Sequence, residues 1–374
     1  MDAKPASVRL DWLDVMKGIS ILWIVFFHSF SFLDFPWPLS RGYFAAFRKL
    51  CGPASSLGEL RCGLESIAVA VTKFGFHAVG VFIVLSGFGL TYSLAKTGEP
   101  PKGWLGWYRS RLLRLFPMYW LAHVVYLVSP FQSEPEPIDY RFLLSFLGDR
   151  IYPIDMIFYY FNPALWYFGL LLQLYLVFPL LFRLLQRVGS PAFLAIVALA
   201  TFGCRYYLLC VSPVSGNWVQ GGFFVSRLWE FALGMVVGLL YRRSASVIDH
   251  WLFSPGAFAA GLVIYTLGVY SYGALWSYTF ADALTGTALS IFLALIARGS
   301  ERLPLVSHAL ATVGVYSYGL YLLHQPYVLY VGARIQHLPT PGFLASIAAL
   351  IVVLTLASMA IERSVNGLTQ RVLG

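Results

Sequence analysis

The chain contains ten long stretches of mostly apolar residues, separated by short polar breaks. A helix needs about 20 such residues to cross the hydrocarbon core of a bilayer. We therefore predict an all-α polytopic membrane protein in which about ten transmembrane helices form one bundle. The expected spans fall near residues 15–35, 67–95, 112–130, 160–185, 190–210, 222–241, 251–272, 278–297, 305–333 and 341–362.

The composition agrees with this class and excludes others. Of 374 residues, 59% are hydrophobic and only 11% are charged, whereas soluble domains contain about 25% charged residues. This deficit excludes a soluble enzyme, a disordered chain and a fibrous protein. The polar breaks are too short for a second domain, so we expect residues 1–374 to form a single integral-membrane domain.

The distribution of Lys and Arg predicts how the bundle is oriented. If the N-terminus is inside, 16 of these residues fall in inner segments and seven in outer segments. Cytoplasmic loops of membrane proteins carry such an excess, so we expect both termini to be cytoplasmic. The net charge of +9 is then explained by these loops, and nucleic acid is not an expected partner. The first span lacks a small-residue cleavage site and is expected to remain as a helix.

The first span carries two ionisable side chains, Lys17 and His28. Such groups are costly within a membrane and usually face a cavity or a partner. Their spacing equals three helical turns plus about 20°, so both project from one helix face, about 16 Å apart along the axis. Asp14 can pair with Lys17. His28 is a candidate general base, and the alternative is a hydrogen bond to a neighbouring helix.

A cluster of arginines opens the third span. Arg111 and Arg114 are three residues apart and share a helix face, and Arg109 lies just before them. Guanidinium groups at a cytoplasmic helix start could clamp phosphate oxygens in a bidentate manner. The alternative is an ordinary anchor at the inner membrane surface.

Acidic residues interrupt three later spans. Arg227 and Glu230 are three residues apart in apolar surroundings and are expected to pair, lining a cavity at most. Asp282 is a lone acid that the outer interface could solvate. Glu362 ends the last span near the inner surface. For Glu230 and Glu362, structural and functional roles both stay open.

A proline also interrupts the ninth span. Pro326 is expected to kink this helix and to free a carbonyl that His324 or Gln325 could contact. For His324, too, a structural and a functional role stay open.

Small residues are concentrated in the second span. Gly75, Gly80, Gly87 and Gly89 would allow a neighbouring helix to approach closely. Ser86, within the same stretch, could donate a hydrogen bond into a cavity. A base at a recognisable spacing is missing, which argues against Ser86 as a nucleophile.

The four cysteines do not form a CxxC or Cys/His pattern typical of a metal site. Cys51 and Cys62 share one polar loop. They could form a disulfide if that loop faces an oxidising periplasm, and two free thiols are the alternative. Cys204 and Cys210 complete the set.

Together these residues resemble the acyltransferase 3 family of membrane sugar O-acyltransferases. The similarity runs in order from about residue 9 to 363. There are two departures from the family pattern: Lys17 stands where arginine is commoner, and Leu171 and Leu172 stand where many members carry acids. The similar segments are Leu10–Ile19 with His28, Gly80–Phe88, Arg111–Pro117, Leu165–Pro179 with Gln173, Arg227–Phe231, Tyr316–Pro326 and Glu362–Arg363.

The resemblance implies a function. Family members are thought to move an acyl group, commonly acetyl, from cytoplasmic acyl-CoA to a sugar hydroxyl, often outside the cell. His28 would then act as the base with Lys17 and Asp14, while Arg109, Arg111 and Arg114 would bind acyl-CoA. The side chains expected to support the cavity are Ser86, Gln173, Arg227, Glu230, His324 and Glu362.

The resemblance also implies partners and a location. Acetyl-CoA would be a donor substrate, and no permanently bound cofactor or metal is expected. The acceptor would be a lipopolysaccharide, an exopolysaccharide, a lipid-linked sugar or a glycoside in or near a bacterial inner membrane. A covalent acyl-histidine intermediate stays open as a variant of the mechanism.

Two functions of other classes compete with this one. Buried ionisable residues also suit a proton-coupled transporter of a small solute, but such proteins often contain inverted repeats, and no internal repeat is evident. An inert scaffold is the third possibility, and it gives no reason for Lys17 and His28 to share a buried helix face.

Overall fold

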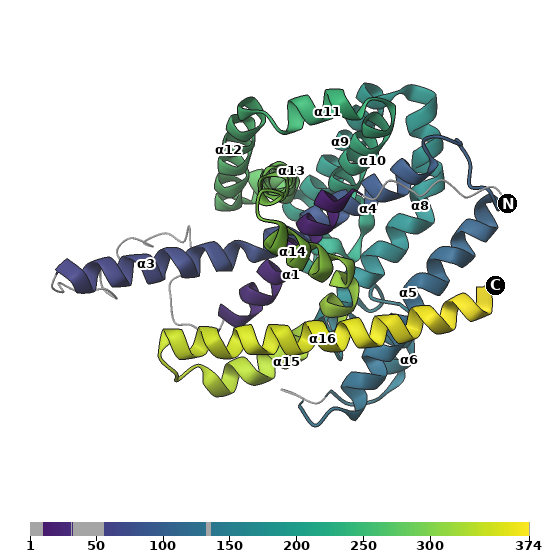
Figure 1. Cartoon of the computed structure of the whole chain (residues 1–374). Coiled ribbons are helices and arrows are strands. Elements are labelled where there is room, and N and C mark those ends of the chain that lie inside the picture. Colours follow the sequence, from purple (N-terminus) through teal and green to yellow (C-terminus); the bar gives the residue numbers. More distant parts are fainter. Residues whose placement is uncertain (1–9, 31, 33–55, 132–135, 374) are drawn as a thin grey trace.

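The computed structural model describes residues 10–30, 32, 56–131 and 136–373. In these ranges the protein consists of helices and contains no strands (Figure 1). The long helices are α1 (Asp11–Phe30), α3 (Ser56–Lys73), α4 (Ala78–Leu94), α5 (Gly103–Val128), α8 (Trp166–Val188), α9 (Ser190–Tyr206), α10 (Leu228–Arg243), α12 (Pro255–Tyr270), α13 (Leu275–Ser300), α14 (Pro304–Val315), α15 (Ser317–Ile335) and α16 (Thr340–Leu373). The short segments are η1 (Phe74–His77), α6 (Tyr140–Phe146), α7 (Ile154–Ile157), η2 (Pro163–Leu165), η3 (Tyr207–Val211), η4 (Trp218–Gly222), η5 (Phe224–Arg227), α11 (Ala245–Leu252) and η6 (Ser271–Gly273).

Eight helical stretches in the described ranges are long and apolar enough to cross a membrane. This is two fewer than the ten spans expected from the sequence. The differences are at α5, whose first half carries three arginines, and at the expected span 305–333, which is divided into α14 and α15. Helices exist in both places, but their length or polarity distinguishes them from the other eight.

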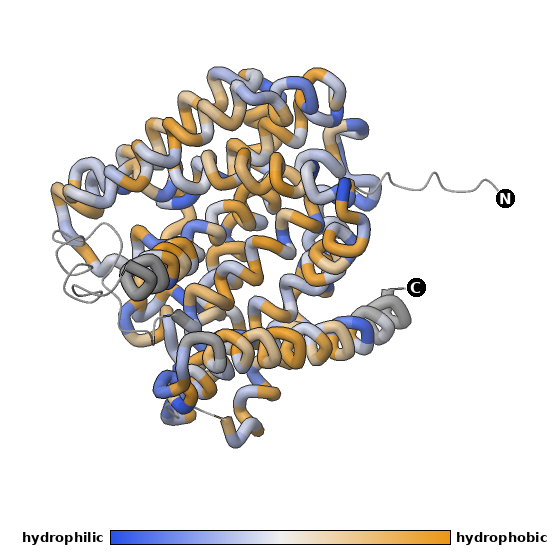
Figure 2. Tube along the Cα trace, turned by 60° about the vertical axis from the view of Figure 1, so that its left-hand side comes forward, coloured by the Kyte–Doolittle hydropathy of each residue, from blue (hydrophilic) through white to orange (hydrophobic). Residues whose placement is uncertain are grey.

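Apolar side chains also cover much of the outer surface. Along α16, Val352, Val353 and Leu356 are 56%, 61% and 59% exposed, and most of this helix is hydrophobic in Figure 2. A soluble monomer rarely exposes large continuous apolar patches. A bilayer accounts for this surface, since lipid tails are as apolar as the side chains that face them.

Glycines allow α4 and α10 to pack with their backbones in contact. A Cβ atom on Gly87 would collide with the Phe231 carbonyl, and one on Gly234 would collide with the Val84 carbonyl. This confirms the close approach predicted for Gly87, and Gly75 and Gly80 also lie against other helices. The prediction is wrong for Gly89, because a Cβ atom there would meet nothing within 4 Å.

Two further glycines bring α1 against α14. A Cβ atom on Gly314 would fall on the backbone carbonyl of Asp14, and one on Gly18 would fall on that of Leu310. Since Asp14 and Lys17 lie on this part of α1, the contact fixes the start of α1 within the bundle.

We therefore expect Gly314→Ala to destabilise the protein by about 1–3 kcal/mol, the usual cost of overpacking a dense interior. Thermal unfolding of the purified protein in lipid nanodiscs would measure the change. The matched control is Gly203→Ala in α9, where a Cβ atom has open space and alanine favours the helix. Equal melting temperatures for the two variants would contradict the proposed backbone contact.

The disulfide considered for Cys51 and Cys62 can be followed at one end only. Cys62 lies in α3 and is disulfide-bonded, whereas Cys51 lies outside the described residues. Cys204 and Cys210 are free thiols. In Figure 1, α3 extends away from the other helices.

Candidate functional site

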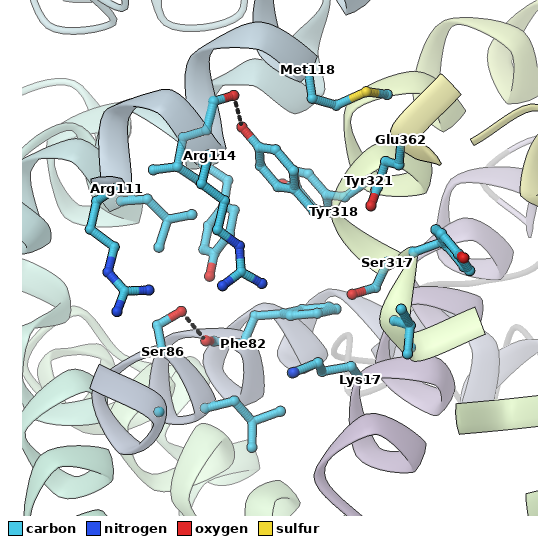
Figure 3. Close-up of a pocket in the computed structure, with 18 of the residues that line it drawn as sticks. Lys17, Phe82, Ser86, Arg111, Arg114, Met118, Ser317, Tyr318, Tyr321 and Glu362 are labelled. Carbon is cyan, nitrogen blue, oxygen red and sulfur yellow. Dashed lines mark hydrogen bonds between the residues drawn. The ribbon is translucent and has the colours of Figure 1, made fainter. Parts of the chain in front are cut away.

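A cavity of about 780 Å³ lies among α1, α4, α5, α8, α14, α15 and α16. Its ionisable lining consists of four cationic side chains, one carboxylic acid and five tyrosines (Figure 3). The cationic groups are Lys17, Arg111, Arg114 and Arg363, the acid is Glu362, and the tyrosines are Tyr167, Tyr175, Tyr316, Tyr318 and Tyr321. The cavity therefore favours an anionic ligand with apolar or aromatic parts.

Arg111 and Arg114 extend from α5 into the cavity, as their spacing predicts (Figure 3). Neither is within ion-pair distance of a carboxylate among the described residues. The Arg111 guanidinium packs over Trp107, 5.5 Å from the ring centre. Its Nε is buried and has no hydrogen-bond acceptor in the described part of the chain. Two guanidinium groups are thus available to a ligand.

Lys17 enters the same cavity from α1. Its Nζ lies 3.1 Å from Oδ1 of Asp14, which confirms the pair predicted from the sequence. Asp14 is 9% exposed and lies outside the cavity lining. Ser86 lines the cavity, but its hydroxyl donates to the Phe82 carbonyl at 2.8 Å. Ser86 thus borders the space without a basic partner among the described hydrogen bonds.

Hydrogen bonds join α15 to the neighbouring helices of the cavity wall. The Glu362 carboxylate accepts from the Gly319 amide, so it holds the start of α15 against α16. The Tyr318 hydroxyl donates to the Leu115 carbonyl of α5 at 2.9 Å. Arg363 donates from Nε to the Tyr316 hydroxyl at 3.0 Å. These contacts position the polar side of α15 that faces the cavity.

Aromatic side chains close the cavity on the side of His324. Tyr321 lines the space and lies at a tilted angle to Tyr167, with ring centres 5.1 Å apart. The ring centre of His324 is 5.6 Å from that of Tyr321, and that of His28 is 5.3 Å from that of His324. Lys17 lines the cavity, whereas His324 and His28 lie outside its lining.

The expected kink at Pro326 has a different partner from the one predicted. Proline lacks the amide hydrogen that would bond the carbonyl four residues earlier, and that carbonyl belongs to Leu322. The side-chain amide of Asn162 donates to it at 2.8 Å. Neither His324 nor Gln325 makes this contact, because Asn162 from the segment before α8 already satisfies the carbonyl.

Three residues expected in the cavity belong to other parts of the protein. Gln173 donates to the Gly222 carbonyl and accepts from the Phe224 amide, so it supports the break before α10. Arg227 and Glu230 pair at 2.8 Å, as predicted, but neither lines the cavity. Arg109, expected to contact the donor, is exposed and lies outside the cavity lining.

Arg227 and Glu230 are part of a larger buried charge cluster. Asp282, expected to be a solvated lone acid, lies 2.9 Å from Arg205 and 3.5 Å from Arg227. Arg205 is 1% exposed and also donates to backbone carbonyls, including that of Thr279 at 2.8 Å. The expectation for Asp282 is therefore wrong, because Arg205, which the sequence patterns did not single out, lies beside it.

The comparisons with known proteins agree with this architecture. The family model described as "Acyltransferase domain" matches residues 10–363. The chain belongs to the acyltransferase 3 family. A distant relative, the acyltransferase MdmB of Streptomyces mycarofaciens, is 25% identical over 284 residues, which cover 68% of each chain. No solved structure matches. With its apolar helices, this acyltransferase 3 family protein is an integral membrane acyltransferase.

Members of such a family need a site for an acyl donor and a site for an acceptor. Among the described residues, no group of three or more His, Cys, Asp or Glu is placed to hold a metal ion.

Sequence reasoning did not find Tyr321 or Asn162 as parts of this region. Tyr321 lies three residues before His324, on the same side of the helix, and this spacing was the available sign of its position.

Proposed function

We propose that this membrane acyltransferase moves an acetyl group from cytoplasmic acetyl-CoA to a hydroxyl of a cell-envelope sugar or polysaccharide. The observation that carries the proposal is the cationic cavity, with two guanidinium groups lacking carboxylate partners among the described residues. Acyl-CoA is anionic at its phosphates and has a narrow, flexible thioester arm. Guanidinium groups bind phosphate oxygens through strong, charge-assisted hydrogen bonds.

The proposed orientation places this cavity at the cytoplasmic side. The start of α1, the start of α5 and the last part of α16 all contribute to its lining. Lys17, Arg111, Arg114 and Arg363 belong to the inner segments defined by the Lys and Arg distribution, and cytoplasmic ends are enriched in such residues. The donor would then enter the cavity from the cytoplasm. The protein itself would lie in the inner membrane of a bacterial cell.

His28 is the proposed general base. It takes the proton from the acceptor hydroxyl, whose oxygen attacks the thioester carbonyl carbon. A new C–O bond forms, the C–S bond breaks, and the CoA thiolate receives the proton from the His28 imidazolium. The acyl group ends on the sugar, and CoA leaves as the thiol. Lys17, held by Asp14, would contribute positive charge to donor binding.

The aromatic side chains around Tyr321 affect how the donor could reach His28. Tyr321 lines the cavity and lies beside His324, which in turn lies beside His28. His28 is outside the lining, so the thioester must move beyond the cavity as it stands to reach this imidazole. The acceptor would reach His28 from another direction.

Replacing Arg111 by alanine is expected to weaken binding of acetyl-CoA at least tenfold. The loss of a hydrogen bond to a charged group costs about 1.5–3 kcal/mol, and each 1.4 kcal/mol is about tenfold in affinity. Arg114→Ala should have a smaller effect, because Arg114 is exposed and water screens its charge. Equilibrium binding of radiolabelled acetyl-CoA to the full chain in nanodiscs would measure both.

Arg109→Ala is the matched control, since Arg109 lies two residues from Arg111 but outside the cavity lining. It removes the same charge from the same helix. Equal losses for Arg109→Ala and Arg111→Ala would point to a general surface charge effect and contradict a donor site in the cavity. Mass spectrometry of surface glycans from cells with and without the protein would identify the acceptor.

A further inference from the structure

His324 is a fully buried imidazole beside the proposed base. Its side chain is 0% exposed. Its ring centre lies 5.3 Å from that of His28, and the two ring planes make an angle of 45°. Two imidazoles joined edge to edge by an N–H···N hydrogen bond of about 2.9 Å would have ring centres roughly this far apart. The two rings are therefore close enough for such a contact, although Nε2 of His324 has no hydrogen-bond partner among the described residues, so one ring must rotate to form it.

The hydrogen bond that His324 already makes determines its tautomer. Its Nδ1 lies 2.8 Å from the carbonyl oxygen of Tyr321. A carbonyl oxygen can only accept, so Nδ1 must carry the hydrogen. In the neutral ring, Nε2 is then an acceptor. This atom is buried and has no hydrogen-bond partner among the residues that the structure describes. Buried polar atoms are normally paired, so this one calls for an explanation.

The backbone that carries His324 is held from outside its own helix. Asn162 is 2% exposed and donates to the Leu322 carbonyl that Pro326 leaves without an amide partner. Its side-chain oxygen accepts from the Ala164 amide at 3.0 Å. Both ends of the Asn162 amide are therefore engaged. Asn162 thus anchors the backbone of α15 two residues before His324.

We infer that His324 is a positioning residue for His28, an inference that rests on the proposed function. The Nε2 of His324 accepts a hydrogen bond from the ring N–H of His28 that faces it. In the neutral ring the opposite nitrogen of His28 is then unprotonated, which is the state that a general base requires. The second nitrogen of a catalytic histidine commonly has such a partner.

The same contact acts throughout the reaction. When His28 takes the proton of the acceptor hydroxyl, its ring becomes cationic and carries hydrogen on both nitrogens. The hydrogen bond to Nε2 of His324 stabilises this cation until the proton passes to the CoA thiolate. His324 keeps its own proton on Nδ1 and exchanges none. It therefore needs to be an acceptor, and it does not need to titrate.

Two amide substitutions separate these requirements. The glutamine side chain extends about as far as imidazole Nε2 and presents an acceptor oxygen there, whereas the shorter asparagine amide reaches only the position of Nδ1. His324→Asn can still donate to Tyr321, but it presents no acceptor to His28. We expect His324→Gln to keep kcat within about tenfold of the native value. We expect His324→Asn to lose about a hundredfold or more.

The measurement uses the full chain in nanodiscs and acetyl-CoA as the donor. Release of the CoA thiol is followed with methyl β-glucoside or water as the acceptor, and the Kd of acetyl-CoA is measured alongside kcat. Because His324 lies outside the cavity lining, Kd should change less than about threefold in both variants. An intact Kd also shows that each variant is folded, so a change confined to kcat reports on positioning.

His28→Ala is measured in parallel to separate the two hypotheses. An active His28→Ala would overturn the proposed function. If His28→Ala is inactive but His324→Asn has native kcat, the inference about His324 is wrong and the proposed function stands. A His324→Gln variant that binds acetyl-CoA but is as slow as His324→Asn also overturns the inference. If His324→Asn fails to bind the donor, the inference about His324 is tested by the kcat of His324→Gln alone.

Discussion

Replacing His28 by alanine is expected to lower kcat for acyl transfer by about a hundredfold to ten-thousandfold, the usual contribution of a general base. The Kd of acetyl-CoA should stay nearly constant, because the cavity that would bind the donor is lined without His28. Equilibrium binding and thiol release from the same nanodisc preparation would separate the two effects. A large rise in Kd would instead place His28 in donor binding.

His77→Ala is a suitable control for removing an imidazole from the bundle. His77 is 4% exposed and bonds the Tyr265 hydroxyl at 3.0 Å through Nδ1, and it lies outside the cavity lining. This variant should lose stability but retain native kcat in its folded fraction. If His28→Ala and His77→Ala had equal kcat, the assignment of His28 as the base would fail.

The mechanism at His28 has a second form that the same protein can test. If His28 attacked the thioester itself, the acetyl group would reside on its imidazole between the two half-reactions. Rapid quenching with radiolabelled acetyl-CoA, followed by peptide mapping, would detect acetyl bound to residue 28. Trapped label there would replace the general-base step by a nucleophilic one. Labelled product and residual labelled acetyl-CoA without labelled protein would support direct transfer.

The features that could be predicted from the sequence depend on local geometry. Residues three or four apart on a helix are neighbours whatever the tertiary structure. For this reason the Lys17 pair with Asp14 and the shared face of Arg111 and Arg114 follow from spacing alone. The positions of the apolar helices also follow, because their length reflects the thickness of a bilayer.

The features that were missed depend on contacts between distant segments. Arg205 reaches Asp282 across 77 residues of sequence, and Asn162 reaches the Leu322 carbonyl across 160. No periodic pattern records such a contact, so Asp282 resembled a solvated acid and Asn162 was not singled out. The family resemblance led to the expectation of Gln173 at the cavity, but its partners lie in the helix break before α10.

The cluster around Arg205 leads to the largest expected effect on stability. Arg205 donates to the carbonyls of Thr279 and Tyr278 at 2.8 and 2.9 Å, and to those of Val219 and Ser226 at 3.3 Å. It thereby connects α9 with α13 and with the segments before α10. A methionine at this position would fill similar space without any donor. Asp282 would keep Arg227 at 3.5 Å but lose its closest cation.

We expect Arg205→Met to destabilise the protein by about 3–5 kcal/mol, since removing one partner leaves a buried charge and buried carbonyls uncompensated. The matched control is Arg298→Ala. It removes an exposed ion pair in which the Arg298 guanidinium lies 3.0 Å from the Glu301 carboxylate, and it should lower the stability by at most about 1 kcal/mol. Thermal unfolding in nanodiscs would measure both variants. Equal stability would show that Arg205 has little structural importance.

The double variant Arg205→Met with Asp282→Leu tests the physical reason for the loss. If an uncompensated carboxylate is the main cost, removing Asp282 as well should restore part of the stability. If the orphaned carbonyls dominate, the double variant should be no more stable than Arg205→Met. The folded fraction of either variant should bind acetyl-CoA with native Kd, because neither residue lines the cavity. A loss of donor binding by folded protein would instead connect this cluster to the site.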